Sequence, residues 1–151
     1  MAGVKLHITA QDKQFRAALQ RLERATRDLT PAFNDIGEYL IQSVEERFNS
    51  QHDPTGTAWT PLAASTLKKK RHRKILTEST DLRGSQTYQA DADELAFGTV
   101  KIYGAIHQLG GKAGRGRRVE IPARPYLGLN DEDEDEIGKI LVDHLAEALK
   151  R

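Results

Sequence analysis

The chain contains no cysteine among its 151 residues. This absence excludes disulfide bridges, zinc sites built on thiolates and cysteine nucleophiles. Aromatic residues make up only 6 %, with a single tryptophan, Trp59. No apolar run approaches the ~20 residues that a membrane-spanning helix needs, and residues 1–10 lack the apolar centre of a signal peptide. We therefore expect a soluble product that works or is assembled inside a cell, with no membrane partner.

The remaining composition is that of a globular protein, and we expect residues 1–151 to form a single domain. Hydrophobic residues make up 38 % and the formal net charge is only +1. The charges are segregated, however, into two basic stretches at 68–74 and 112–118 and one acidic block at 131–136. Segregation of this kind gives positive and negative faces, which suit head-to-tail self-association or an anionic partner.

Apolar residues at helical spacing predict two amphipathic helices near the N-terminus, over 12–29 and 31–50. Thr30–Pro31 is expected to start the second helix, with Thr30 as the N-cap and proline at the first helical position. A third helix is predicted over 137–149. The acids at 131–136 precede it or occupy its first turn, where the helix dipole favours negative charge.

Strand patterns are shorter. Residues 4–8 alternate apolar and polar side chains, and 87–99 has the composition of a β-hairpin around a polar turn. A short helix is expected at 103–109, then a mobile glycine-rich loop over 110–118, then a short strand from Val119. The predicted fold class is α+β: an N-terminal helical pair, a small mostly antiparallel sheet and a C-terminal amphipathic helix.

No motif for catalysis or metal binding is complete in this sequence. The stretch 110–116 resembles a phosphate-binding loop but lacks its first glycine and the Ser or Thr after its lysine. The acidic block resembles a calcium loop, yet Glu136 and Val142 stand where that loop needs glycine and glutamate. No histidine pair has metal-ligand spacing, and no serine lies in a Gly-x-Ser-x-Gly elbow. We expect no cofactor, no metal and no enzymatic activity; a hydrolase with an unrecognised carboxylate pair is the rival from that class.

The basic run at 68–74 suggests a contact with DNA, because each phosphate that Lys or Arg neutralises releases counterions. The run has no interleaved aromatic residue to stack on bases, so such a contact would not depend on base sequence. The alternative function is therefore a non-specific DNA-binding protein that uses Lys68, Lys69, Lys70, Arg71, Arg73 and Lys74.

Three segments together carry a family resemblance. The first is a loop with Pro54, Gly56, Trp59, Pro61 and Leu62, followed by the basic run. The second, 103–111, reads Tyr-Gly-Ala-Ile-His-Gln-Leu-Gly-Gly, and the third, 121–129, reads Ile-Pro-Ala-Arg-Pro-Tyr-Leu-Gly-Leu. In this order and spacing they resemble the phage virion morphogenesis family of tail-completion proteins. Two departures stand out: Leu109 where the family often has phenylalanine, and Ser79–Thr80 where it often has Thr-Gly, which removes a residue that accommodates positive φ.

The resemblance implies a structural role in virion assembly, in tail completion or head–tail joining, without catalysis. It implies an α+β fold that forms rings, often hexameric. The expected partners are copies of this chain and other tail or head–tail connector proteins, with non-specific DNA contact if DNA passes through the ring. The expected location is the virion, and the host cytoplasm during assembly. Segregated charge is compatible with head-to-tail contacts, which close into rings when the rotation permits.

Individual residue roles are hypotheses. Trp59 is expected to anchor the 49–62 loop by burial. His107 and Gln108 are expected either to hydrogen-bond to the 121–128 segment or to form a local helix-end cap. Arg124 lies between prolines and is expected to pair with an acid of its own chain or of a neighbour. The candidate subunit-interface residues are Arg124, Arg117, Arg118, Asp131 and Asp133.

Overall fold

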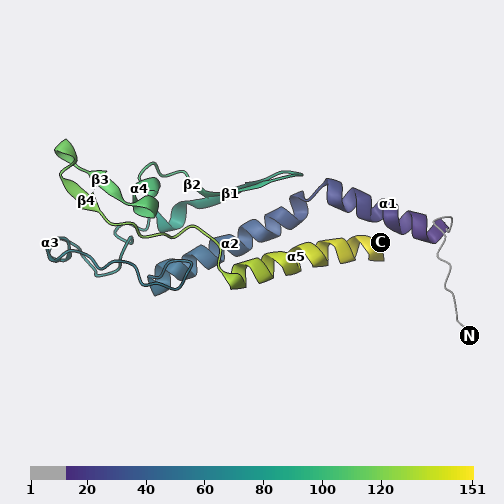
Figure 1. Ribbon diagram of the computed structural model, residues 1–151, viewed down its shortest axis with the longest axis horizontal. Helices are drawn as coiled ribbons and strands as arrows, with labels where there is room; N and C mark the ends of the chain where they lie inside the picture. Colours follow the sequence, from purple (N-terminus) through teal and green to yellow (C-terminus); the bar gives the residue numbers. More distant parts are fainter. Residues whose placement is uncertain (1–12) are drawn as a thin grey trace, which may run out of the picture.

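Three long helices run through the molecule, as the computed structural model in Figure 1 shows. The structure describes residues 13–151, so the predicted strand at 4–8 lies outside the described residues. Helix α1 (Lys13–Arg27) leads into α2 (Thr30–Ser50), and α5 (Asp131–Lys150) lies beside α2 and also contacts α1. The predicted helical pair and C-terminal helix are confirmed, and the acids at 131–134 occupy the first turn of α5.

The start of α2 differs from the prediction by one residue. The helix begins at Thr30, so the N-cap position belongs to Leu29, and the prediction of Thr30 as the N-cap is wrong. The carboxylate of Asp28 accepts a hydrogen bond of 3.0 Å from the Thr30 N–H. This bond satisfies one of the donors that a helix start leaves without an intrahelical partner. Pro31 fits the first turn because a missing N–H costs nothing there.

The predicted hairpin at 87–99 is confirmed as β1 (Gln86–Ala90) paired antiparallel with β2 (Leu95–Thr99). It packs on α2 at a glycine. A Cβ on Gly37 would lie 2.4 Å from the ring of Tyr88, so any larger residue would push the hairpin away. The Tyr88 hydroxyl donates a hydrogen bond of 2.8 Å to Glu38 and fixes this crossing point.

The sheet structure is divided in two, because β3 (Gly111–Ala113) and β4 (Val119–Ile121) form a second, separate antiparallel pair. The short helix η2 (Arg115–Arg117) closes that hairpin. The expectation of a mobile loop over 110–118 is therefore wrong, since its backbone pairs with residues 119–121. The remaining elements are short: α3 (Ala64–Leu67), η1 (Arg83–Ser85) and α4 (Gly104–Leu109).

The apolar core lies at the C-terminal end of α2. Phe48 is fully buried, and the ring centroids of Trp59 and Tyr126 each lie 5.5 Å from its own. The Trp59 ring meets Phe48 edge to face at 80°, a favourable aromatic geometry. The cluster is completed by Val44, Ile75 and Leu82. The core thus joins the end of α2, the loop after it and a segment that precedes α5.

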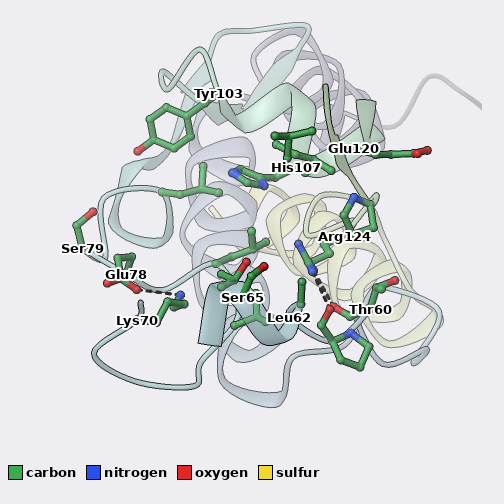
Figure 2. A pocket seen from close by; sticks show the side chains of 18 of the residues that line it. Thr60, Leu62, Ser65, Lys70, Glu78, Ser79, Tyr103, His107, Glu120 and Arg124 are labelled. Carbon is green, nitrogen blue, oxygen red and sulfur yellow. Dashed lines mark hydrogen bonds and ion pairs between the residues drawn. The ribbon is translucent and has the colours of Figure 1, made fainter. Parts of the chain in front are cut away.

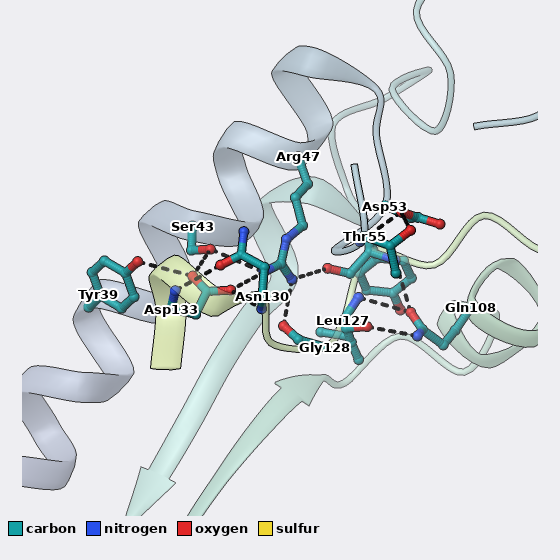
Figure 3. Close-up of polar contacts among 11 residues, drawn as sticks. Tyr39, Ser43, Arg47, Asp53, Thr55, Gln108, Leu127, Gly128, Asn130 and Asp133 are labelled. Carbon is teal, nitrogen blue, oxygen red and sulfur yellow. Dashed lines mark hydrogen bonds and ion pairs between the residues drawn. The ribbon is translucent and has the colours of Figure 1, made fainter. Parts of the chain in front are cut away.

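A buried ion pair fixes α5 against α2 (Figure 3). The Arg47 guanidinium in α2 contacts the Asp133 carboxylate in α5, and the two side chains are only 6 % and 1 % exposed. Arg47 Nη1 also donates to the carbonyls of Tyr126 at 3.0 Å and Gly128 at 2.7 Å. The charge is therefore surrounded by acceptors, which is the condition for a buried ion to be tolerated.

Asp133 has further partners within the same chain. Its carboxylate accepts hydrogen bonds from the hydroxyls of Tyr39 at 3.0 Å and Ser43 at 2.6 Å. It also forms a capping box with Asn130, in which each side chain bonds the other residue's backbone N–H. Burial, followed by the bond to Asp133, raises the pKa of Tyr39 to about 12. The prediction of Asp133 as a subunit-interface residue is therefore wrong, because its carboxylate is enclosed by its own chain.

Replacing Asp133 by asparagine is expected to lower the free energy of unfolding by about 3–5 kcal/mol, because the substitution leaves the Arg47 charge buried and unpaired. Urea unfolding of the full chain measures this. Asp135→Asn is the matched control, since Asp135 is exposed on the same helix and such surface changes stay within about 0.5 kcal/mol. Equal effects of the two substitutions would show that the ion pair does not hold α5 in place.

Candidate functional site

A cleft of about 740 Å³ opens beside the core (Figure 2). One wall is the loop at 60–63 together with α3, and another is the segment 76–82. The far side is formed by His107 of α4, by Tyr103 immediately before that helix, and by all three residues of β4. Apolar atoms form most of the exposed lining, although polar and charged side chains, among them Lys70, Glu78 and Glu120, also contribute to it. This is the general form of a recess that binds a ligand or a peptide segment.

His107 points into the cleft from α4 (Figure 2), and its ring meets that of Tyr103 edge to face at 6.2 Å. Its Nδ1 is buried and has no hydrogen-bond partner within the described part of the chain. Burial, and next the nearby charge of Arg124, lowers the pKa of His107. The His107 carbonyl, not its ring, accepts a hydrogen bond of 2.7 Å from the Arg124 N–H.

Gln108 makes the predicted contact with the 121–128 segment (Figure 3). Its Nε2 donates to the Leu127 carbonyl at 2.9 Å, and its Oε1 accepts from the N–H groups of Tyr126 at 3.0 Å and Leu127 at 2.9 Å. The side chain thus acts as a clamp between α4 and the segment before α5. The end of α4 is instead formed by Gly110, whose φ is +73° and whose Cβ, if present, would lie 2.8 Å from the Ala123 nitrogen.

Trp59 and Arg124 connect the 121–128 segment to the loop after α2. Trp59 is 4 % exposed, and its Nε1 donates to the Pro125 carbonyl at 2.8 Å. In return, Arg124 donates from Nε to the Thr60 carbonyl at 2.8 Å and from Nη2 to the Pro61 carbonyl at 3.1 Å. The expectation that Arg124 pairs with an acid of its own chain or of a neighbour is wrong within the described residues. The side chain is buried and makes no ion pair there, and its Nε and Nη2 donate to carbonyls of its own chain.

The other candidate interface residues are exposed. Arg117 and Arg118 lie at the tip of the β3–β4 hairpin, and Asp131 starts α5. Within the described ranges no ion pair joins these arginines to the acids at 131–136, so the structure leaves their partners open.

The basic run at 68–74 follows α3 as an irregular turn. Its exposed members are Lys68, Lys69, Arg71, Arg73 and Lys74. Lys70 differs, because its ammonium group pairs with Glu78 at 3.0 Å and donates to the Lys74 carbonyl at 3.0 Å. Lys70 therefore holds the turn against the cleft wall, and the prediction that it is free to contact DNA is wrong.

Two other kinds of feature, a metal-binding cluster and a membrane-spanning helix, are not found in the described part of the chain. Residues 13–151 contain no cluster of three or more His, Asp or Glu side chains placed to hold a metal ion. Over the same residues, none of the helices combines the length and the apolar character needed to cross a bilayer.

The geometry defines an α+β protein with a cleft and segregated surface charge. Beside the cleft, the 121–128 segment is held by hydrogen bonds from a set of side chains that we call the frame: Arg47, Trp59, Gln108 and Arg124. The chain belongs to the phage virion morphogenesis family, which it matches over residues 10–146. This match confirms the resemblance carried by the three sequence segments.

Relatives resemble the chain along almost its whole length. "Mu-like prophage FluMu G protein 2" of Haemophilus influenzae is 36 % identical, over 91 % of this chain and 94 % of its own. "Putative capsid assembly protein G" of Escherichia phage Mu is 32 % identical, over 99 % of each chain. "Tail completion protein S" of Escherichia phage P2 is 27 % identical, over 87 % of this chain and 97 % of its own. No solved structure matches the chain.

The backbone of Thr80 is strained. The resemblance in sequence leads us to expect glycine at this position, and the φ of Thr80 is +60°, a left-handed conformation that β-branched residues rarely adopt. Thr80→Gly is expected to raise the free energy of unfolding by about 0.5–1 kcal/mol, because relief of the strain exceeds the added entropy of the unfolded chain. Urea unfolding measures the change. The control, Thr87→Gly in strand β1, is expected to destabilise, and a loss of stability at both positions would contradict the argument.

Stability is expected to fall as the pH is lowered through the range in which an ordinary histidine titrates, near 6.5. The folded state disfavours the charged form of His107, so the unfolded chain binds the proton first and stability rises with pH across this window. His107→Phe is expected to flatten the dependence between about pH 7 and 5. The measurement is the unfolding midpoint at each pH, with His72→Gln at an exposed position as the control. An unchanged slope in His107→Phe would contradict the assignment.

Proposed function

We propose that this protein is a structural, non-enzymatic component of virion assembly that acts in tail completion or head–tail joining as a ring-forming oligomer. The observation that supports the proposal most strongly is the family match over residues 10–146. The names of the relatives divide between capsid assembly and tail completion. The junction between head and tail is where both descriptions meet, so the proposed location is the virion, after assembly in the host cytoplasm.

In this proposal the frame around the 121–128 segment gives each subunit a fixed shape. Trp59, His107 and Gln108 are its anchors, because their bonds tie the loop after α2, helix α4 and the approach to α5 together. A ring needs every copy to present the same angle between its two contacting faces, and a rigid frame supplies that angle.

The proposed subunit contact is between the basic hairpin tip and the acidic start of α5. Arg117 and Arg118 are exposed at one site, and Asp131 is exposed at another, with no ion pair between them inside the described chain. Two different surfaces of opposite charge make a head-to-tail contact, which closes into a ring when the rotation permits. The DNA-binding alternative is not favoured, since none of the relatives reported above is named for binding DNA.

The double substitution Arg117→Glu and Arg118→Glu is expected to weaken self-association by about tenfold or more, because it places like charges opposite Asp131. Light scattering of the full chain across concentration and salt measures the association. The matched control is Lys69→Glu with Arg71→Glu, which changes the net charge equally in the other basic stretch and leaves the proposed contact intact.

The role in assembly is tested in the virus itself. Deleting the gene is expected to yield heads and tails that fail to join or tails that are incomplete, visible by electron microscopy. Infectious, fully joined particles without the gene would overturn the proposed function.

A further inference from the structure

Exposed apolar side chains are concentrated in the part of the sequence that contains α4 and β4. Five of the large hydrophobic residues exposed in residues 13–151 lie between positions 100 and 119: Val100, Ile102, Tyr103, Leu109 and Val119. Ile102 is 97 % exposed, and Tyr103 and Val119 form part of the cleft lining. Exposed apolar residues at the lining of a recess, here Tyr103 and Val119, are typical of a surface that another segment covers in the assembled state.

The same cleft offers an open strand edge. β4 pairs with β3 in a sheet of two strands, so its other edge has no strand partner among the described residues. All three residues of β4 line the cleft. An extended segment placed there gains backbone hydrogen bonds to β4 while its alternate side chains enter the apolar recess, which is the mode of β-strand addition.

The sequence contains one segment of matching pattern outside the described residues. Val4, Leu6 and Ile8 alternate with polar residues, so as a strand they would present one apolar face. Val4 lies nine residues before Lys13, where α1 starts, and nine residues span at most about 32 Å.

Nine residues are too few to carry Val4 from the start of α1 to the cleft of the same chain. The cleft adjoins the core at the C-terminal end of α2, and α2 and α1 lead away from it one after the other (Figure 1). These helices have 21 and 15 residues, which correspond to about 31 Å and 22 Å. The start of α1 therefore lies at the other end of the molecule, farther from the cleft than nine residues can span.

We propose that the cleft binds residues 4–8 of a second copy of this chain as an added strand along β4, with Val4, Leu6 and Ile8 against its apolar lining. The proposal rests on the proposed function in one respect, namely that copies of the chain contact each other. The cleft and the start of α1, which the donor segment precedes in the sequence, lie at opposite ends of the molecule (Figure 1). Each copy therefore gives one strand and receives one, and the contact propagates head to tail.

Because the chain has no cysteine of its own, introduced thiols report this contact without background. Two full-length variants, Leu6→Cys and Val119→Cys, are mixed and oxidised, and their disulfide-linked heterodimer is measured on a non-reducing gel. The control is His7→Cys with Val119→Cys, since His7 belongs to the opposite face of the alternating segment. We expect at least about tenfold more heterodimer from position 6 than from position 7.

A second measurement does not depend on oxidation. Val119→Asp is expected to weaken self-association by about tenfold or more, because it puts a charge into the apolar contact. Val142→Asp on α5 is the control, since Val142 is exposed to a similar extent but lies away from the cleft. Circular dichroism verifies that both variants keep the fold.

The outcomes separate the two proposals. Oligomers that form normally without the 6–119 crosslink, and that tolerate Val119→Asp, would overturn the added strand and leave the proposed function standing. A crosslink that forms within a single doubly substituted chain would overturn the reach argument. Both proposals would be overturned if the purified chain stayed monomeric at every concentration while the virus that encodes it remained infectious.

Discussion

The buried contact between Arg47 and Asp133 is the constraint on which the rest of the fold depends. One carboxylate serves as ion-pair partner, as half of the capping box and as acceptor for two hydroxyl groups of α2. Because these roles require one position of Asp133, α5 can begin at only one point along α2. The guanidinium in turn bonds two carbonyls of the preceding segment, so a single pair of charges sets the register of three parts of the chain.

The segment at 121–128 shows how an irregular stretch can lie in the interior. Four successive carbonyls, 125 to 128, each accept a hydrogen bond from a side chain: Trp59, Arg47, Gln108 and again Arg47. Buried backbone groups need partners, and a strand or helix supplies them from neighbouring backbone. Here long side chains from distant parts of the sequence do so instead. The prolines at 122 and 125 suit this arrangement because they have no N–H to satisfy.

Periodic elements were predictable because their signal is local: the helices α1, α2 and α5 and the first hairpin each follow one hydrophobic period. The hydrogen bonds around the 121–128 segment were predictable only in part. The contact of Gln108 with residues 126 and 127, 18 and 19 positions away, was predicted. The long-range bonds of Arg47 and Arg124 join residues 63 to 86 positions apart and leave no local pattern. Charged residues were assigned to the surface by default, which misplaced Arg124 and Asp133. Two signals were nevertheless present. Arg47 follows Leu40 and Val44 at helical spacing on the buried stripe of α2, and Asn130 and Asp133 have the spacing of a capping box.

The separate basic and acidic surfaces of the described chain suit contacts between its copies. Of the three buried side-chain atoms without a hydrogen-bond partner in the described chain, only Nδ1 of His107 belongs to a residue that lines the cleft. The exposed basic stretches and the acidic start of α5 are separate. A two-fold contact pairs a basic surface with an acidic one only where both surfaces belong to the same interface, since residue i then contacts residue j and j contacts i. A head-to-tail contact pairs opposite charges by setting one surface against a different surface of the next copy, and its repetition gives rings or filaments.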